Sequence, residues 1–216
     1  MKAILIGATG LIGTELLKQL LEDTAFESVK VVVRKSTGVK ADKLEEVLVD
    51  FDNLEPSADE LKGDVLFSTL GTTLKTAGSK ERQYEIDYGM QFNSAKFARE
   101  NGVNKLVLLS SAGANATSSI FYSKMKGELD EAVEKLGFEN VAIIRPSMLV
   151  GDRKEFRLSE KIFTPLMYAF TWIPGLRKYR PIKDKVVAKA MINAAKNQQD
   201  IYKIYELATI FMLAEG

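Results

Sequence analysis

The amino-terminal stretch constrains the fold of this chain more than any other part of it. An apolar run from Ala3 to Ile6 predicts a buried strand, and Gly7-x-x-Gly10-x-x-Gly13 follows at once. The next residues, Leu11 to Leu21, have the apolar spacing of a helix. A glycine turn between a strand and a helix aims backbone amides and the positive end of the helix dipole at a pyrophosphate. The stretch therefore predicts a dinucleotide-binding βα unit.

The spacing of the three glycines gives each a separate task. Gly7 permits a tight turn, Gly10 lets phosphates approach the backbone, and Gly13 lets the helix pack against the strand. The pattern is GxxGxxG rather than the GxGxxG of most two-domain dehydrogenases. A glycine turn in some other α/β protein is the alternative, and the position between a clear strand and a clear helix disfavours it.

Apolar strands and helical stretches alternate along most of the remaining sequence. The strands are rich in Val, Ile and Leu, which is typical of strands buried on both faces. Strands are expected at Val29–Val33, Val47–Phe51, Asp64–Ser68, Lys105–Ser110, Val141–Arg145 and, as an edge, Ile201–Tyr205, and helices at 79–101, 120–136 and 184–197. This alternation predicts an α/β fold, a doubly wound parallel sheet with helices on both faces.

With 216 residues, 46% of them hydrophobic, the chain can bury a full core, and we expect a single NAD(P)-binding Rossmann domain over residues 1–216. The pattern changes after residue 150, where a charged stretch (152–161) precedes an apolar, aromatic one (162–176) that prolines interrupt. The apolar stretch is either ordinary packing of a C-terminal helix or a flap over the carboxyl ends of the strands. Residues 152–180 are a candidate substrate flap. The C-terminal region is too short for a second domain, so we expect it to form a small cap at most.

Composition excludes several classes of function. The 30 basic and 29 acidic residues leave a net charge of +1, so bulk charge favours neither nucleic acid nor an anionic membrane. The sequence contains no cysteine and no histidine. Their absence excludes disulfides, thiolate nucleophiles, iron–sulfur clusters and a Ser-His-Asp hydrolase, and we expect no metal site. Proton transfer near neutral pH would use a carboxylate, a lysine or a tyrosine.

The sequence also carries no obvious targeting signal. It shows neither an apolar signal peptide nor an apolar stretch long enough to span a bilayer. Because the first residues are needed as a strand, we expect them not to be a cleaved leader. These observations predict a cytoplasmic protein without a membrane segment.

The end of the second strand bears on the choice of dinucleotide. An acidic residue there would bind the adenosine 2′-hydroxyl of NAD, but this strand ends in Arg34-Lys35. A guanidinium forms two hydrogen bonds with a 2′-phosphate and an ammonium adds a point charge, so the pair favours NADP(H). A solvated basic loop is the alternative. Small residues follow the fourth strand, and Leu70 and Gly71 are candidate contacts to the adenosine side of the cofactor.

A candidate catalytic group follows the fifth strand. Ser110 and Ser111 end that strand, and the next helix carries Tyr122-x-x-x-Lys126. This spacing places the tyrosine and the lysine one turn apart on one helical face. Free tyrosine is a poor acid–base catalyst at neutral pH, and a nearby ammonium favours the phenolate. The serine hydroxyl would hold the substrate oxygen beside the phenol, and the sequence leaves open which of the two serines does so.

Together these motifs resemble the atypical short-chain dehydrogenases/reductases, and most closely the Tat-interacting-protein-like subgroup of NAD(P)-binding oxidoreductases. The resemblance covers most of the chain up to about residue 160. It is carried by the glycine turn and by LGTT (70–73), LLSSAGA (108–114), YSKMKGE (122–128) and RPSMLVGDRKEFR (145–157).

The resemblance implies an NADPH-binding Rossmann fold with Tyr122 and Lys126 in the reductase roles. It also implies that Thr9, Gly10, Leu11 and Ile12 line the phosphate turn, that Arg34 and Lys35 hold the 2′-phosphate, and that Leu70, Gly71, Leu149 and Arg157 make further cofactor contacts. An exposed salt bridge to Glu155 or Glu160 is an equal alternative for Arg157. Two departures stand out: Asp87 lies where many relatives place an asparagine, and the gap between Ser111 and Tyr122 is slightly short.

Two functions are consistent with this sequence. The first is an NADPH-dependent reductase acting on a small carbonyl or activated alkene, with Tyr122 as proton donor, Lys126 tuning it and Ser111 positioning the oxygen. The second is an NADPH-binding redox sensor that acts through a protein partner. A methyltransferase is disfavoured, because it would usually need a carboxylate where Arg34 stands. Homodimer formation is left open.

Overall fold

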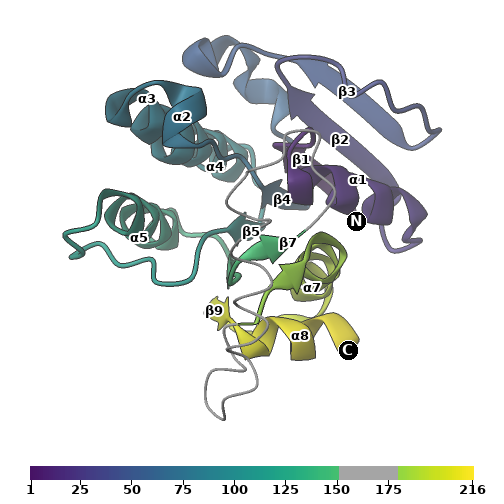
Figure 1. Cartoon of the computed structure of the whole chain (residues 1–216). Helices are drawn as coiled ribbons and strands as arrows, with labels where there is room; N and C mark the ends of the chain where they lie inside the picture. Colours follow the sequence, from purple (N-terminus) through teal and green to yellow (C-terminus); the bar gives the residue numbers. More distant parts are fainter. Residues whose placement is uncertain (151–179) are drawn as a thin grey trace.

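The computed structural model describes residues 1–150 and 180–216, which fold around one parallel sheet (Figure 1). Its strand order is β3-β2-β1-β4-β5-β6-β9, and every neighbouring pair is parallel. The strands are β1 (Lys2–Ile6), β2 (Ser28–Val33), β3 (Leu44–Leu48), β4 (Val65–Ser68), β5 (Lys105–Leu109), β6 (Asn140–Arg145) and β9 (Tyr202–Glu206). A separate two-stranded ladder joins β7 (Leu149–Val150) to β8 (Ile182–Lys183). The predicted doubly wound sheet is confirmed.

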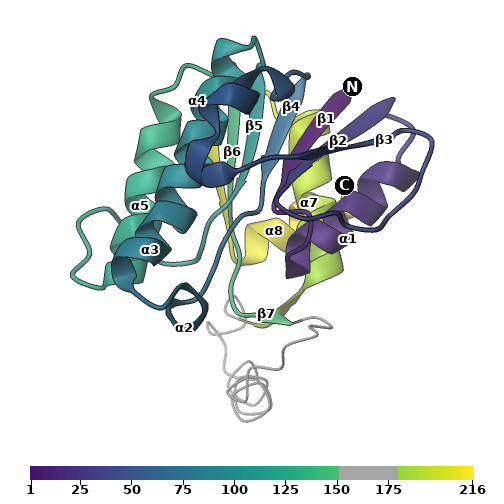
Figure 2. The ribbon, with the colours of Figure 1, turned by 90° about the horizontal axis from the view of Figure 1, so that it is seen from above.

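Helices cover both faces of the sheet (Figure 2). The long ones are α1 (Leu11–Glu22), α4 (Gln91–Glu100), α5 (Phe121–Glu134), α7 (Asp184–Asn197) and α8 (Ala208–Glu215). Shorter segments are the 3₁₀ turns η1 (Phe51–Asn53) and η2 (Glu55–Glu60), the helices α2 (Leu74–Ala77) and α3 (Lys80–Tyr84), and the π-helical turn η3 (Glu85–Met90). In both views α1, α7 and α8 lie on one face, and α3, α4 and α5 lie on the other.

Alternation along the strands builds one core on each face. In β1, Ala3 and Leu5 join the core beneath α1 and α7, whereas Ile4 and Ile6 join the core beneath α4 and α5. All four side chains are at most 1% exposed. Since this part of the strand is buried on both faces and has no solvated side, all positions from Ala3 to Ile6 are apolar, which is the pattern that the sequence showed.

The strand order reverses at β1, which pairs with β2 on one side and with β4 on the other. The loops that leave β1 and β4 therefore diverge to opposite faces and open a crevice at their carboxyl ends. Figure 2 shows α2 and β7 at this end of the sheet, with the N-terminus at the opposite end. This edge is where the functional residues were expected.

Some elements differ from the sequence prediction. β3 runs over Leu44–Leu48 instead of 47–51, because the Asp50 side chain accepts a hydrogen bond from Asp52 N (3.0 Å) and begins the 3₁₀ turn η1. The single helix expected at 79–101 is α3, the π-turn η3 and α4 in succession. Helix α8 was not predicted, and of the candidate flap only Arg180 lies within the described residues.

Within residues 1–150 and 180–216 no helix is both long enough and apolar enough to cross a bilayer. The same residues contain no grouping of three or more acidic side chains that could hold a metal ion.

Candidate functional site

The glycine turn is a tight, closely packed connection between β1 and α1. Gly7 has φ +83°, in the left-handed region, and a Cβ there would lie 2.6 Å from the backbone carbon of Thr69. Gly10 N donates to Gly7 O (3.0 Å), which closes the turn. A Cβ on Gly13 would overlap Gly7 O and lie 2.7 Å from Gly7 C. The turn therefore has room for hydrogen only at positions 7 and 13.

The start of α1 leaves its first amides available to a ligand. Gly10 is the N-cap residue, and no side chain in the described part of the chain caps this end of the helix. The first N–H groups of a helix have no partner within the helix, and together with the dipole they form a favourable site for a phosphate. The backbone amides of Leu11 and Ile12 belong to this turn, although the Ile12 side chain is buried in the core beneath it.

A cleft of about 350 Å³ opens beside this turn. Six of the predicted cofactor residues lie along it: Gly7, Thr9, Gly10, Arg34, Leu70 and Gly71. Among the residues that the structure describes, the other predicted ones do not line it. Lys35 is exposed next to Arg34, Leu149 packs half-buried in β7 against the core, and Arg157 lies outside the described residues.

The far wall of this cleft was missed by sequence reasoning. It comes from the segment after β4, from α2 and α3, and from the start of η3, and its residues are Thr69, Thr72, Thr76, Ala77, Arg82 and Ile86. Thr73 and Ser79 cap α2 and α3 by accepting hydrogen bonds from Thr76 N and Arg82 N (3.1 Å each). The sequence offered a signal in Thr73 and Ser79, since Ser and Thr are favoured N-cap residues and here begin two short helices whose residues line the cleft.

The two serines at the end of β5 have different surroundings. Ser110 is 6% exposed, and its hydroxyl donates to Asp130 Oδ2 (2.9 Å) in the interior. Ser111 is half-buried, and its hydroxyl makes only a 3.5 Å contact with Ala112 O among the described residues. Ser110 is thus engaged in structure, whereas Ser111 keeps a hydroxyl for a ligand.

The loop after β5 is fastened to the first turn of α5. Asn115 N donates to Ser123 O (3.0 Å), and the Ser123 hydroxyl donates to Gly113 O. Further along the helix, a Cβ on Gly127 would overlap the backbone of Asn115. These contacts fix the loop that carries Ser111 against the helix that carries the Tyr-Lys pair.

Tyr122 and Lys126 differ sharply in exposure. Tyr122 is 41% exposed, whereas Lys126 is 3% exposed. A phenol open to solvent can meet a substrate, while an ammonium shielded from water acts strongly on its neighbours. Two of those neighbours are buried carboxylates, Asp87 and Asp130, each of which interacts electrostatically with Lys126.

Asp87 projects from the π-turn η3 into the interior, where it is 1% exposed. Its carboxylate accepts hydrogen bonds from Thr72 N (2.8 Å) and Gln83 Nε2 (3.3 Å). Burial raises the pKa of the Asp87 carboxyl, while Lys126 and these hydrogen bonds act in the opposite direction. A π-turn often marks a functional position, because the extra residue redirects the side chains that follow.

Asp130 anchors a second buried group. Its Oδ2 accepts from Ser110 and from Arg145 Nε (2.9 Å each), and Arg145 also pairs with Glu206 (3.2 Å). Burial raises the pKa of the Asp130 carboxyl against the opposing effect of Arg145. Asp130 Oδ1 is buried and has no hydrogen-bond partner among residues 1–150 and 180–216. The network connects α5 with the carboxyl ends of β5, β6 and β9.

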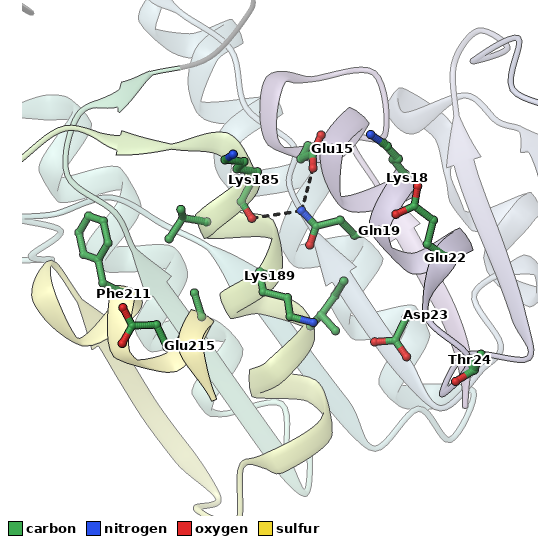
Figure 3. A pocket seen from close by; sticks show the side chains of 13 residues that line it. Glu15, Lys18, Gln19, Glu22, Asp23, Thr24, Lys185, Lys189, Phe211 and Glu215 are labelled. Atoms are coloured by element: carbon green, nitrogen blue, oxygen red, sulfur yellow. Dashed lines mark hydrogen bonds between the residues drawn. The ribbon is translucent and has the colours of Figure 1, made fainter.

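A larger groove of about 780 Å³ lies elsewhere, between α1, α7 and α8 (Figure 3). Gln19 bridges its two main walls by donating to Glu15 Oε1 (2.8 Å) and to Lys185 O (3.1 Å). Acidic and basic side chains mix along it, and none of the predicted site residues within 1–150 lines it. We therefore place the candidate functional site at the smaller cleft.

Comparison with known sequences identifies relatives over nearly the whole chain. A family described as NAD(P)H-binding matches residues 7–162. The Candida albicans protein named Protein FMP52, mitochondrial, is 38% identical over 91% of this chain and 88% of its own length. Its Eremothecium gossypii namesake is 32% identical over 100% of this chain and 98% of its own length.

Solved structures share the fold at low identity. MoeE5 in complex with UDP-glucose and NAD superposes with a TM-score of 0.72 at 15% identity, covering 100% of this chain and 81% of that one. UDP-glucose 4-epimerase from Thermotoga maritima gives 0.70 at 15% identity, covering 100% and 82%. This likeness concerns the fold alone.

The relatives correct one expectation. Their names place them in mitochondria, so the predicted cytoplasmic location is wrong. The prediction relied on the lack of an apolar leader. A mitochondrial address is amphipathic and arginine-rich instead, so that criterion cannot exclude it.

The glycine turn, the parallel sheet and these relatives agree. The chain belongs to the NAD(P)H-binding family and is a relative of the FMP52 proteins, and its fold is the one that the resemblance to atypical short-chain dehydrogenases/reductases predicted.

Proposed function

We propose that this chain is an NADPH-dependent oxidoreductase that reduces a small carbonyl compound or activated alkene, with Tyr122 as proton donor. One observation carries the proposal. The Asp87 carboxylate accepts from Thr72 N in the nucleotide cleft and also faces Lys126 of α5. The cleft and the Tyr122–Lys126 face of α5 therefore meet through a single buried side chain.

The residues around the cleft fit a phosphorylated dinucleotide. Its pyrophosphate would lie on the uncapped start of α1, where Gly7 and Gly13 have no room for a side chain. Arg34 and Lys35, both exposed at the end of β2, would hold the 2′-phosphate. When bound, NADPH supplies the hydride.

The remaining chemistry belongs to the protein. The Tyr122 hydroxyl gives a proton to the substrate oxygen, and the Ser111 hydroxyl holds that oxygen in place. Lys126 favours the phenolate that remains, and Asp87 and Asp130 keep the ammonium oriented within a dry environment. Leu70, Gly71, Leu149 and Arg157 are proposed as further cofactor contacts.

Substitution of Tyr122 by phenylalanine tests the proposal. We expect NADPH affinity by calorimetry to stay within about twofold, while NADPH oxidation with a panel of carbonyl compounds falls by about 10²–10⁴-fold. Tyr84→Phe is the matched control, because the Tyr84 hydroxyl bonds Glu128 (3.1 Å) away from Lys126. It should leave turnover unchanged.

The wild-type protein decides between the two functions weighed from the sequence. Tight NADPH binding without turnover across a broad panel would contradict a reductase and favour a redox sensor that acts through a protein partner. Binding of neither NADPH nor NADH would contradict both.

A further inference from the structure

An ion pair stands at the adenosine end of the nucleotide cleft. Both terminal nitrogens of Arg82 contact Asp52, at 2.5 Å to Oδ1 and 2.9 Å to Oδ2. The same guanidinium also contacts Glu85 Oε2 at 2.9 Å. Both oxygens of Asp52 are thus directed at one arginine, in the planar two-point geometry that lysine cannot reproduce.

This pair lies beside Arg34, the residue expected at the 2′-phosphate. Arg82 and Arg34 line the same cleft. Asp52 lies in η1, just after β3, the strand that pairs with β2. The hydrogen bonds from Arg82 lower the pKa of the Asp52 carboxyl, and the charge of Arg34 lowers it further, so the three groups interact.

Asp52 would otherwise oppose binding of a phosphorylated cofactor. A carboxylate close to the 2′-position repels a 2′-phosphate, as an acidic residue at the end of the second strand does in NAD-binding Rossmann folds. With Arg82 present, the two arginines balance Asp52 and Glu85. Without it, the carboxylates would exceed Arg34 by one charge beside a dianionic group.

We propose that Arg82 is a specificity-determining residue, which selects NADPH over NADH by occupying the Asp52 carboxylate and by presenting a second guanidinium to the 2′-phosphate. This inference rests on the proposed function, and only on its cofactor half. It assigns a role to a residue from α3, far along the chain from the basic pair that follows β2.

Titration calorimetry with NADPH, NADH, 2′,5′-ADP and ADP measures the preference without requiring turnover. We expect the wild type to prefer the 2′-phosphorylated member of each pair. Arg82→Gln should reduce that preference by about tenfold, and Arg82→Lys should give an intermediate loss. Glu85→Gln is the matched comparison: it keeps the Arg82–Asp52 pair and removes one of the two carboxylates, so it should raise the preference rather than lower it.

The double variant Arg82→Gln/Asp52→Asn separates the two parts of the role. Removing the released carboxylate should restore part of the preference, because repulsion disappears while the second guanidinium is still missing. Thermal unfolding of each variant shows that it is folded.

The results for the wild type and the variants separate failure of the Arg82 role from failure of the proposed NADPH-dependent function. A wild type that binds neither nucleotide, or that prefers NADH, overturns the proposed cofactor and the inference together. A wild type that prefers NADPH while Arg82→Gln keeps the same ratio overturns the inference alone. A double variant no different from Arg82→Gln would contradict masking of Asp52.

Discussion

Replacing Gly13 by alanine tests how closely α1 packs on the glycine turn. In an ordinary helix this change stabilises the protein, because alanine has the higher helix propensity by about 1 kcal/mol. Here the new Cβ would overlap Gly7 O and lie 2.7 Å from Gly7 C. The obstacle is backbone, and Gly7 has φ +83°, so the turn cannot yield without leaving its left-handed conformation.

These terms give the magnitude of the effect. Forcing an extra methyl group into a packed site costs about 1–3 kcal/mol, and a rigid backbone obstacle places the cost at the upper end. Subtracting the propensity gain leaves a net loss of about 2 kcal/mol. For a domain of this size, that lowers the melting temperature by about 4–8 °C. NADPH affinity should fall as well, because the phosphate turn must shift.

Gly89→Ala is the matched control. Gly89 lies in the π-turn η3, and a Cβ there meets no atom within 4 Å. We expect it to raise stability by up to about 1 kcal/mol and to leave NADPH affinity unchanged. Differential scanning calorimetry and titration calorimetry measure both properties. The reasoning would be refuted if Gly13→Ala melted at or above the wild-type temperature, or if it bound NADPH as tightly as the wild type does.

Three further predictions concern the buried polar groups. Asp130→Ala leaves Arg145 without its buried partner and should lower the free energy of unfolding by about 3–5 kcal/mol in urea titrations. A loss below about 1 kcal/mol would show that the ion pair does not stabilise the fold. Burial raises the pKa of the Asp87 carboxyl, so its stabilising contribution is largest below the unfolded pKa and is lost as pH rises through the folded one. Asp87→Asn should therefore gain stability relative to wild type when unfolding is measured at pH values rising from about 4. An unchanged difference between those pH values would contradict this sign. Ser111→Ala should lower kcat with little change in the free energy of unfolding. Ser110→Ala should instead lower the free energy of unfolding by about 1.5–3 kcal/mol, because its hydrogen bond to Asp130 is lost. Equal effects from the two substitutions would contradict a structural role for Ser110 and a substrate-binding role for Ser111.

The parallel sheet could be predicted from the sequence because its central strands carry nearly continuous apolar runs. Val31 and Val33 join one core, and Val32 joins the other. β3 was placed three residues too late, since it is a half-exposed edge strand, and the apolar Val49 and Phe51 beyond its end lie in a loop and a 3₁₀ turn. Periodicity identifies burial, and burial at an edge does not require a strand.

Sequence motifs located the candidate-site residues that directly follow a strand, and they missed those that only tertiary contacts bring to the cleft. Gly7, Gly10 and Arg34 follow two adjacent strands, so their shared edge follows from topology. Arg82 reaches the cleft only because η1 places Asp52 opposite α3. The difference between Ser110 and Ser111 likewise depends on Asp130, twenty residues beyond Ser110. No sequence spacing reports such pairings.

The wide turn η3 has a consequence for how this segment can vary. An added residue in a helix rotates everything beyond it by about 100°. In η3 two side chains donate hydrogen bonds to backbone carbonyls of the widened turn: Gln91 Nε2 to Asp87 O (2.6 Å) and Ser94 Oγ to Met90 O (2.7 Å). Shortening residues 85–90 by one position would restore a regular helix and swing either Asp87 or the apolar stripe of α4 out of register. Length in this segment is therefore under tighter constraint than composition.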